Sequence, residues 1–379
     1  MGKSAICIWM NIPSHHQRAF FSVLHEDAEL EVKILYFNRL RPERIHEGWK
    51  SFALEPYEAF LPEGFAPESD MDEVLVDWRE RIHVFSYCYR PDLADFLTHT
   101  RVPWVHWSDR GGVFLMKLVK NRMLPYRCLE KIYNWYKRKD GRVIQRNALG
   151  VFQTGRLTGK YFRAIGIDPE RCENLFYAIQ KPECAETDDG VRRFLRGRRA
   201  FLFVGSLYDL KGVRQLLRSL AALKNPDWAL VFCGRDRSGG VYERMVGELG
   251  LGDRVYFAGT RASDRIGEIY AGCDMVVLPS FFDGWGMTLI EGAACGKALI
   301  GSDMSGAAHE IIRSGENGFL VPAGSETALL RAMNAYAENP ALAAEHGQRS
   351  KEIFSQEFSL PNNVRRFKDA LNKWQKTSN

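Results

Sequence analysis

The sequence has no apolar run that approaches the roughly 18 residues needed to span a membrane. The apolar stretch from Ile6 to Met10 is too short for a signal peptide, and no small-residue cleavage site follows it. The eight cysteines form no CxxC pair, and no histidine spacing completes a zinc site. We therefore expect a cytoplasmic protein whose cysteines are reduced, several of them buried within apolar runs.

Three further signatures are missing. There is no metal-ligand carboxylate motif, no module that reads nucleic-acid bases and no short-period repeat. What is present is a chain of 379 residues, 45% hydrophobic and 26% charged. That composition is typical of a soluble globular protein, and the length suits two domains of fewer than about 200 residues each.

The net charge of +5 is unevenly distributed. Ten Lys and Arg residues lie in residues 113–146 against Glu130 and Asp140, which gives this segment +8 and leaves −3 for the rest of the chain. Aromatic and aliphatic side chains are interleaved with these charges. They are Phe114, Leu115, Met116, Tyr126, Tyr133, Trp135 and Tyr136. This mixture favours contact with an anionic membrane surface, with a solvated charged face as the simpler alternative and nucleic acid as a third.

Short apolar runs alternate with amphipathic stretches along the whole chain, which predicts βαβ units and parallel sheets. The predicted strands are Ala5–Met10, Val32–Phe37, His83–Tyr87, Trp104–Trp107, Gly150–Gln153, Ala200–Val204, Ala229–Cys233, Val255–Phe257, Met275–Leu278 and Ala298–Ile300. The polar stretch 181–199 has the composition of a linker. We expect a first α/β domain at 1–180, a second at 200–355 and a C-terminal helix at 356–379.

The C-terminal segment carries one apolar stripe at helical spacing, formed by Val364, Phe367, Leu371 and Trp374. Such a stripe must be buried, and we expect it to dock back onto the first domain. Ligands of open parallel sheets bind beyond the carboxyl ends of the strands. Two sheets that face each other therefore predict a cleft between the domains, with the chemistry on the loops after the strands.

In the second half, glycine turns follow several predicted strands. Gly205 and Ser206 come after the first of them, with Lys211 shortly before a helix. This arrangement suits phosphate binding, because glycine lets the backbone approach and a helix N-terminus offers free N–H groups. Gly234–Arg235 and Gly259–Thr260 follow the next two strands, where ordinary turn chemistry is the simpler interpretation.

The most specific segment is residues 275–321. Asp283 lies in a glycine-rich turn that contains Gly284, Trp285, Gly286 and Met287, and Glu291 lies in the helix that follows. Seven residues separate the two carboxylates. Ionised carboxylates are strong acceptors for sugar hydroxyls, and turn N–H groups suit a diphosphate.

This segment resembles the donor site of glycosyltransferase family 4, a GT-B family that retains anomeric configuration. The resemblance covers about residues 200–335 and includes Pro279-Ser280, Ala294-Cys295-Gly296 and the stretch Glu316 to Val321. It implies two Rossmann-like domains, a nucleotide-diphosphate sugar as donor, no metal and no other cofactor. Glu291 would hold the ribose, Asp283 would lie by the transferred sugar, and Lys211 would bind the diphosphate. The loop at Thr260 and Arg261 would hold the base through its backbone.

Two positions depart from the pattern. Asp283 stands where the family usually has Glu, and Ser206 stands where it usually has Arg. The second change removes one of two cations expected on the leaving diphosphate, and such a donor is typically worth about 3–4 kcal/mol. Arg235 or another nearby basic residue would then supply the charge. A catalytically weak relative that binds a partner is the alternative that these departures favour.

The first half is less specific. His15 and His16 follow the first strand, where relatives often have a glycine pair. They would contact phosphate or acceptor, or else begin a solvated helix capped by Ser14. Asp109 falls where many relatives have a histidine facing the donor sugar, and His106 lies three residues earlier. Either is a candidate catalytic residue, although His106 also fits a packed strand.

The resemblance implies an enzyme that transfers a sugar to a glycan or lipid-linked acceptor, in the synthesis of lipopolysaccharide, O-antigen or exopolysaccharide. A location in the cytoplasm, with attachment to the inner face of the cell membrane through 113–146, fits this acceptor. A sugar-nucleotide epimerase or a sugar-phosphate synthase is another enzyme considered for this scaffold. The Asp283–Glu291 spacing favours the transferase.

Overall fold

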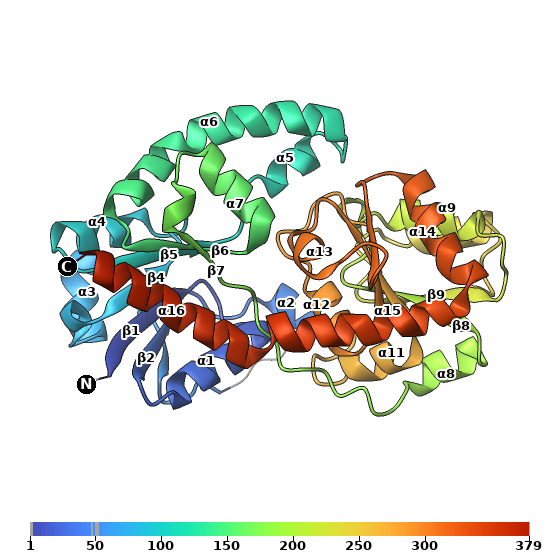
Figure 1. Ribbon diagram of the computed structural model, residues 1–379, viewed down its shortest axis with the longest axis horizontal. Helices are drawn as coiled ribbons and strands as arrows, with labels where there is room; N and C mark the ends of the chain where they lie inside the picture. Colours follow the sequence, from blue (N-terminus) through green and yellow to red (C-terminus); the bar gives the residue numbers. More distant parts are fainter. Residues whose placement is uncertain (1–2, 47, 50–52, 379) are drawn as a thin grey trace.

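The computed structural model describes residues 3–46, 48–49 and 53–378. The first half forms a seven-stranded parallel sheet in the order β3-β2-β1-β4-β5-β6-β7 (Figure 1). Its strands are β1 Ser4–Met10, β2 Leu30–Tyr36, β3 Glu58–Phe60, β4 Ile82–Phe85, β5 Trp104–Ser108, β6 Gly150–Gln153 and β7 Cys172–Asn174. The order in which successive strands are added reverses between β1 and β4, which makes the carboxyl ends of these parallel strands a place for ligands.

The second half repeats this architecture with a six-stranded parallel sheet in the order β10-β9-β8-β11-β12-β13. Its strands are β8 Arg199–Val204, β9 Trp228–Cys233, β10 Val255–Gly259, β11 Met275–Leu278, β12 Ala298–Ser302 and β13 Gly318–Val321. Numbered within this domain, the order is 3-2-1-4-5-6, that of a dinucleotide-binding sheet. The switch point lies between β8 and β11.

Helices cover both faces of the first sheet. One face packs against α1 (His15–Glu26), and the other against α3 (Pro67–Val74), α4 (Pro91–His99), α6 (Met123–Asn147) and α7 (Gly155–Ala164). Two short helices, α2 (Pro42–His46) and α5 (Val113–Leu118), follow strands at the edge that faces the second domain. Because helices cover both faces of the sheet, the side chains on both sides of each strand are buried, and the strands are continuous apolar runs in the sequence.

The second sheet is enclosed by one large core cluster. Its helices are α8 Asp189–Leu195, α9 Val213–Ala221, α10 Val241–Glu248, α11 Ile266–Gly272, α12 Met287–Ala294, α13 Gly306–Ile311, α14 Glu326–Glu338 and α15 Pro340–Ile353. Within the described part of the chain, none of the helices has the length and apolar character that a membrane span requires.

The ten predicted strands are all present, with ends that differ by at most two residues. The sequence prediction missed β3, β7 and β13. Each of the three is only three or four residues long and lies at the edge of a sheet, with side chains that are partly exposed. A short edge strand carries little apolar periodicity, because only one neighbour fixes it and solvent reaches much of its surface.

The predicted linker 181–199 is only partly a linker. Residues 189–195 form α8, and Val191 and Leu195 are buried in the core of the second domain. The helix begins at Asp188, whose carboxylate accepts hydrogen bonds from the N–H groups of Gly190 and Val191. The charged composition arose because the outer face of this short helix is solvated.

The C-terminal segment crosses back to the first domain as predicted (Figure 1). A π-helical turn (Phe354–Phe358) joins α15 of the second domain to α16 (Leu360–Ser378). The predicted apolar stripe is buried beside α1 and β7. A Cβ added to Gly150 would lie about 2.1 Å from the indole ring of Trp374, so the helix packs directly on the backbone of β6. A single segment therefore packs on both domains and fixes one relative to the other.

Candidate active site

The polar residues predicted for the donor site lie on loops at the carboxyl ends of β8, β9, β10 and β11, and on α12. Lys211 ends a short 3-10 turn (Asp209–Lys211) after β8, and Asp283 lies in the turn between β11 and α12. These loops flank the switch point of the second sheet and face the first domain. The topology of the sheet thus brings these residues together, although they lie far apart in the sequence.

Asp283 and Lys211 form the central ion pair. Lys211 Nζ lies 2.5 Å from Asp283 Oδ2, and about one fifth or less of each side chain is exposed. Burial alone would lower the pKa of Lys211, but the nearby Asp283 carboxylate more than offsets this and raises it. Lys211 is therefore a permanent cation at neutral pH, positioned to receive an anion.

Glu291 lies on α12 and is 9% exposed. Its Oε2 accepts a hydrogen bond of 2.7 Å from the hydroxyl of Tyr270, and its Oε1 lies 3.8 Å from Nδ1 of His16 on α1. Burial raises the pKa of Glu291 and lowers that of His16 to about 3. His16 is thus neutral at physiological pH, and the contact is not an ion pair. The carboxylate of Glu291 is therefore held at the domain junction, and its oxygens can accept further hydrogen bonds from a ligand.

Glycines keep the backbone of these loops close together. Gly205 and Gly234 have φ of 134° and 147°, and a Cβ on Gly234 would lie 2.1 Å from the carbonyl oxygen of Gly205. Gly286 has φ of 97° and precedes the first turn of α12. Side chains at these positions would separate the loops and cover the N–H groups that open α12.

The first domain contributes Asp109, which follows β5. One oxygen accepts a hydrogen bond of 3.1 Å from the hydroxyl of Tyr177, and the other is buried and has no hydrogen-bond partner among the described residues. A Cβ on Gly284 would lie 3.4 Å from Asp109 Oδ2, so this carboxylate touches the turn that carries Asp283. Burial raises the pKa of Asp109, and the charge of Asp283 raises it further. Two carboxylates from different domains therefore face one small volume.

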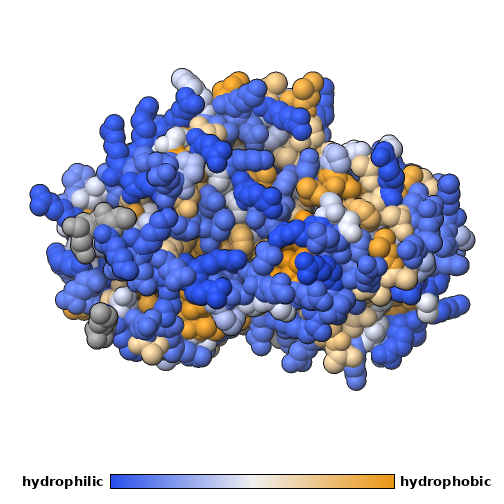
Figure 2. Space-filling model, in the orientation of Figure 1, coloured by the Kyte–Doolittle hydropathy of each residue, from blue (hydrophilic) through white to orange (hydrophobic). Residues whose placement is uncertain are grey.

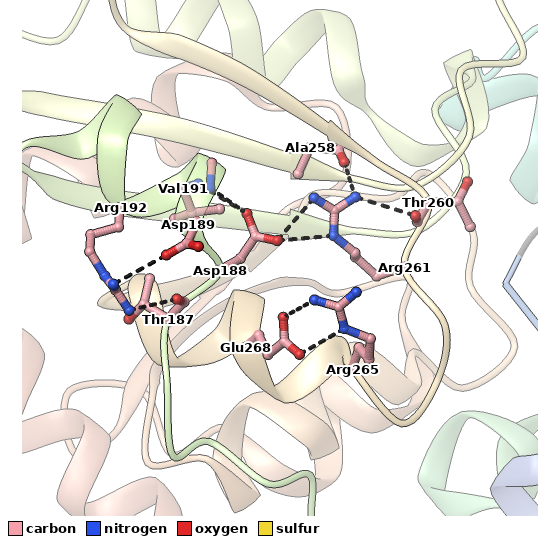
Figure 3. A network of polar contacts seen from close by, with 11 residues as sticks. Thr187, Asp188, Asp189, Val191, Arg192, Ala258, Thr260, Arg261, Arg265 and Glu268 are labelled. Atoms are coloured by element: carbon pink, nitrogen blue, oxygen red, sulfur yellow. Dashed lines mark hydrogen bonds and ion pairs between the residues drawn. The ribbon is translucent and has the colours of Figure 1, made fainter.

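The loop after β10 is held by a charge network (Figure 3). The guanidinium of Arg261 contacts Asp188 Oδ2 at 3.1 and 3.3 Å and donates to the carbonyl oxygen of Ala258. The pKa of Asp188 is lowered, because hydrogen bonds from Val191 and Arg261 outweigh its burial. The guanidinium of Arg261 is thus occupied by Asp188 and Ala258, so a ligand at this loop would be contacted through the backbone rather than through this side chain.

The side chains of two predicted site residues, His106 and Trp285, are packed in the protein interior. His106 is fully buried in β5, where its Nδ1 accepts from the N–H of Tyr87 and its Nε2 contacts the hydroxyl of Ser108. Burial lowers its pKa to about 3. The ring of Trp285 is 3% exposed and stacks on Phe176 at 5.3 Å. His106 is therefore a packed strand histidine, and Trp285 offers the site only its backbone.

The remaining predicted residues differ in their surroundings. Ser206 and Met287 are partly buried beside the loops described above. Arg235 is exposed beyond β9, and its side chain has no polar contact among the described residues. These placements leave Lys211 as the cation nearest Asp283 in the second domain.

Sequence reasoning missed three residues that shape the site. Tyr270 orients Glu291, and Tyr177 orients Asp109. Arg110 is 9% exposed, donates from Nη2 to the carbonyl oxygen of Met304 and lies 4.0 Å above the ring of Phe282. The tyrosines carry no distinguishing signal in the sequence, because each lies within an apolar pattern. Arg110 directly follows Asp109, and its position there was the only clue.

No group of three or more His, Cys, Asp or Glu side chains in the described ranges has the geometry to hold a metal ion.

Residues 186–353 match the model of the family described as glycosyl transferases group 1. A D-inositol 3-phosphate glycosyltransferase of Rhodococcus opacus (strain B4) is 33% identical over 224 residues, which are 55% of this chain and 50% of that protein. Lipopolysaccharide core biosynthesis mannosyltransferase LpcC of Rhizobium leguminosarum bv. viciae is 33% identical over 187 residues, 47% of this chain and 52% of that protein. The chain spans about half the length of the curated relatives it matches.

Among solved structures, HepE of Anabaena in complex with UDP is similar over 97% of this chain and 100% of its own, with a TM-score of 0.75 and 17% identity. Sucrose-phosphate synthase from Thermosynechococcus elongatus is similar over 98% of this chain and 100% of its own, with a TM-score of 0.69 and 17% identity. The chain therefore has the GT-B fold, as the sequence predicts.

Proposed function

We propose that this protein is a glycosyltransferase that takes a sugar from a nucleotide-diphosphate donor and places it on a hydroxyl of a glycan or lipid-linked acceptor. The observation that carries the proposal is the arrangement of Lys211, Asp283 and Glu291. All three lie within the matched range 186–353. Lys211 pairs with Asp283, and Glu291 contacts His16 of the first domain. A nucleotide sugar requires a cation for its diphosphate, a carboxylate that orients the transferred sugar and a second carboxylate that accepts hydrogen bonds from the ribose hydroxyls.

In this proposal each part of the donor has its own partner. Glu291 accepts hydrogen bonds from the ribose, and Lys211 with the N–H groups that open α12 binds the diphosphate. Asp283 and Asp109 lie where the transferred sugar would be, one from each domain. The raised pKa of Asp109 favours its protonated form more than is usual for an aspartate, so that it can donate as well as accept.

Transfer proceeds with retention of configuration in the mechanism that we propose. The bond between the anomeric carbon and the diphosphate oxygen breaks, and the acceptor hydroxyl attacks from the same face. Its proton passes to an oxygen of the departing diphosphate. Negative charge accumulates on the departing diphosphate, and this is the charge that Lys211 stabilises. Buried groups of fixed orientation stabilise it best, because they need not reorganise during the reaction.

The first test is thermal stability of the purified protein with a panel of nucleoside diphosphates, beginning with UDP, the ligand in the HepE structure. A nucleotide present at about 100 times its Kd should add about 2.7 kcal/mol to the free energy of unfolding. The sugar derivatives of the stabilising nucleotide are then assayed for release of nucleoside diphosphate. Absence of stabilisation by every nucleotide would contradict the proposal and favour the catalytically weak, partner-binding alternative.

We also propose that transfer needs no metal, because Lys211 already supplies positive charge where a divalent ion would otherwise act. We expect a chelator such as EDTA to leave the turnover rate unchanged, and added Mg²⁺ or Mn²⁺ to raise it less than twofold or so beyond the effect of ionic strength. Turnover with the best donor is measured before and after chelation. Loss of activity in EDTA that Mg²⁺ restores would contradict this part of the proposal.

The acceptor side of the proposal involves a membrane surface. Seven of the ten large hydrophobic side chains that are exposed in the described structure lie on α5 and α6. They are Val113, Phe114, Leu118, Leu124, Ile132, Trp135 and Tyr136. Figure 2 shows hydrophobic and hydrophilic residues side by side along the upper edge of the molecule, where α6 lies in Figure 1.

Leu124, Ile132 and Trp135 share one face of α6, at spacings of eight and three residues, and are 62–77% exposed. Exposed basic residues, including Arg127 and Lys131, flank this stripe. An apolar stripe between basic residues fits a bilayer of anionic lipids, in which the apolar side chains enter the headgroup region and each basic residue adds about 1 kcal/mol. A lipid-linked acceptor would be reached from this surface.

We expect the protein to sediment with vesicles that contain about one third anionic lipid and not with neutral vesicles. Replacing Leu124 and Trp135 together by Ser should weaken the binding at least tenfold or so, because two large apolar side chains no longer enter the lipid. Val76→Ser is the matched control, since Val76 is 86% exposed but lies outside the stripe. Equal binding by the double variant and the control would rule out this surface.

A further inference from the structure

The segment of the first domain that contains α2 lies against the donor-side loop of the second domain. Gly48 has φ of 91°, and a Cβ added to it would lie 2.5 Å from the carbonyl oxygen of Arg261 and 3.0 Å from Cγ2 of Thr260. There is thus no room for a side chain between this segment and the loop after β10. The contact is across the domain junction, beside the residues proposed to hold the donor base.

Within this segment, Arg44 and Trp49 stand next to the histidine pair of α1. Trp49 packs edge-on against His15 at 4.9 Å and against His16 at 5.7 Å between ring centroids. The guanidinium carbon of Arg44 lies 5.0 Å from the centroid of the Trp49 ring. Since His16 in turn lies 3.8 Å from Glu291, Arg44 is connected to the donor carboxylate through two packed rings.

The charge of Arg44 acts on both sides of the junction. On the first domain it helps to lower the pKa of His16, after burial and His15, which have the larger effects. On the second domain it acts to lower the pKa of Lys211, but the nearby Asp283 carboxylate raises this pKa by more. Charges interact appreciably within about 10 Å at moderate ionic strength, and the packing of Arg44 on Trp49, beside the His16 that reaches Glu291, brings its charge to this junction.

We infer that Arg44 supplies the second cation for the donor diphosphate, from the first domain, in place of the arginine that is missing at Ser206. This inference rests on the proposed function. Both arginines are exposed, but Arg44 packs on Trp49 beside His16, whereas the side chain of Arg235, beyond β9, has no such contact in the described structure. A guanidinium suits the task, since its planar donors bind phosphate oxygens in pairs.

The division of the two cations between domains has a functional consequence. Lys211 belongs to the second domain and Arg44 to the first, so the diphosphate is fully neutralised only when the domains are together. Leaving-group stabilisation then depends on closure, and a donor bound to the second domain alone would be hydrolysed slowly. A cation at position 206 would lie in the second domain with Lys211, so it would stabilise the leaving group without domain closure.

The experiment compares Arg44→Ala, Arg44→Lys and Arg41→Ala by isothermal titration calorimetry. Arg41 is the matched control, because it is an exposed arginine three residues earlier. The ligands are the nucleoside diphosphate that stabilises the wild type most and the nucleoside with the same base. We expect Arg44→Ala to weaken binding of the diphosphate about tenfold, a change of 1.4 kcal/mol, and to leave nucleoside binding unchanged. Arg44→Lys should retain part of the affinity, and the difference should shrink at high salt.

Three outcomes would overturn the inference. In the first, Arg44→Ala would bind the diphosphate as tightly as the wild type does. In the second, Arg44→Ala would lose affinity for the nucleoside and for the diphosphate equally, which would indicate that Arg44 only supports Trp49. The third is an equal loss in Arg41→Ala, which would indicate a general charge effect. Failure of the wild type to bind any nucleoside diphosphate is a distinct result, because it removes the proposed function itself and the inference with it. Melting temperatures without ligand show that each variant is folded.

Discussion

Lys211→Ala is expected to lower kcat for sugar transfer by about 10²- to 10³-fold, the usual effect of removing one group that stabilises charge in the transition state. Lys211 is the cation paired with Asp283 at 2.5 Å, and the reaction proposed here develops its charge on the leaving diphosphate. Affinity for the nucleoside without phosphate should not change. The measurement is the initial rate at saturating donor, together with calorimetric binding of the nucleoside.

Loss of Lys211 also leaves Asp283 without its ion-pair partner, so a loss of activity has to be separated from a loss of folding. Arg214→Ala is the matched control, because Arg214 also forms an ion pair, with Asp209 at 2.8 Å, but on the exposed side of α9. Its kcat should equal that of the wild type. A kcat for Lys211→Ala that also equals the wild-type value, in a protein with unchanged melting temperature, would exclude Lys211 from the mechanism.

Glu291→Gln is expected to reduce the affinity for nucleoside diphosphate by about 10- to 100-fold, since a hydrogen bond to a charged acceptor typically contributes about 1.5–3 kcal/mol. The substitution is nearly isosteric, and the amide oxygen of Gln can still accept the hydrogen bond from Tyr270 that Glu291 Oε2 accepts. Binding is measured by calorimetry. Glu326→Gln is the control, because Glu326 pairs with Arg218 on the exposed side of the second domain.

The same variant should be at least as stable as the wild type, and the reason is electrostatic. Burial raises the pKa of Glu291, so the folded protein binds a proton there more tightly than the unfolded chain does. The ionised form therefore destabilises the fold as pH rises above about 4.3, the ordinary value for glutamate. The stability of Glu291→Gln relative to the wild type should be smallest at acidic pH and grow as pH rises through the raised pKa. Equal pH profiles in denaturant unfolding would contradict this assignment.

A loss of binding combined with a gain in stability distinguishes a functional carboxylate from a structural one. A structural carboxylate such as Asp188, whose pKa is lowered by its hydrogen bonds, stabilises the fold at neutral pH. Glu291 does the opposite, because it lies at a position where burial opposes its ionisation. Strain of this kind is characteristic of functional sites.

The sequence was sufficient to predict the architecture, because buried parallel strands are unbroken apolar runs and the helices between them are amphipathic. Ten strands followed from that pattern, and the C-terminal stripe through Phe367 predicted the crossing of α16. The edge strands β3, β7 and β13 and the helix α8 did not follow, since short elements with solvated faces resemble loops. Their form depends on a neighbouring strand or core that lies far away in the sequence.

At the site, the sequence by itself determined the identity of the chemical groups of the second domain, because Asp283 and Glu291 lie in one segment of recognisable spacing and Lys211 follows a glycine turn within the range of the resemblance. Only the tertiary structure decided which residues of the first domain join them. It buried His106 in a strand, where both ring nitrogens are occupied, and it placed Asp109 against Gly284. It also brought Arg44 to the domain junction, against Trp49 and beside His16. These contacts depend on how two separately folded sheets pack together, and local sequence pattern carries no information about that packing.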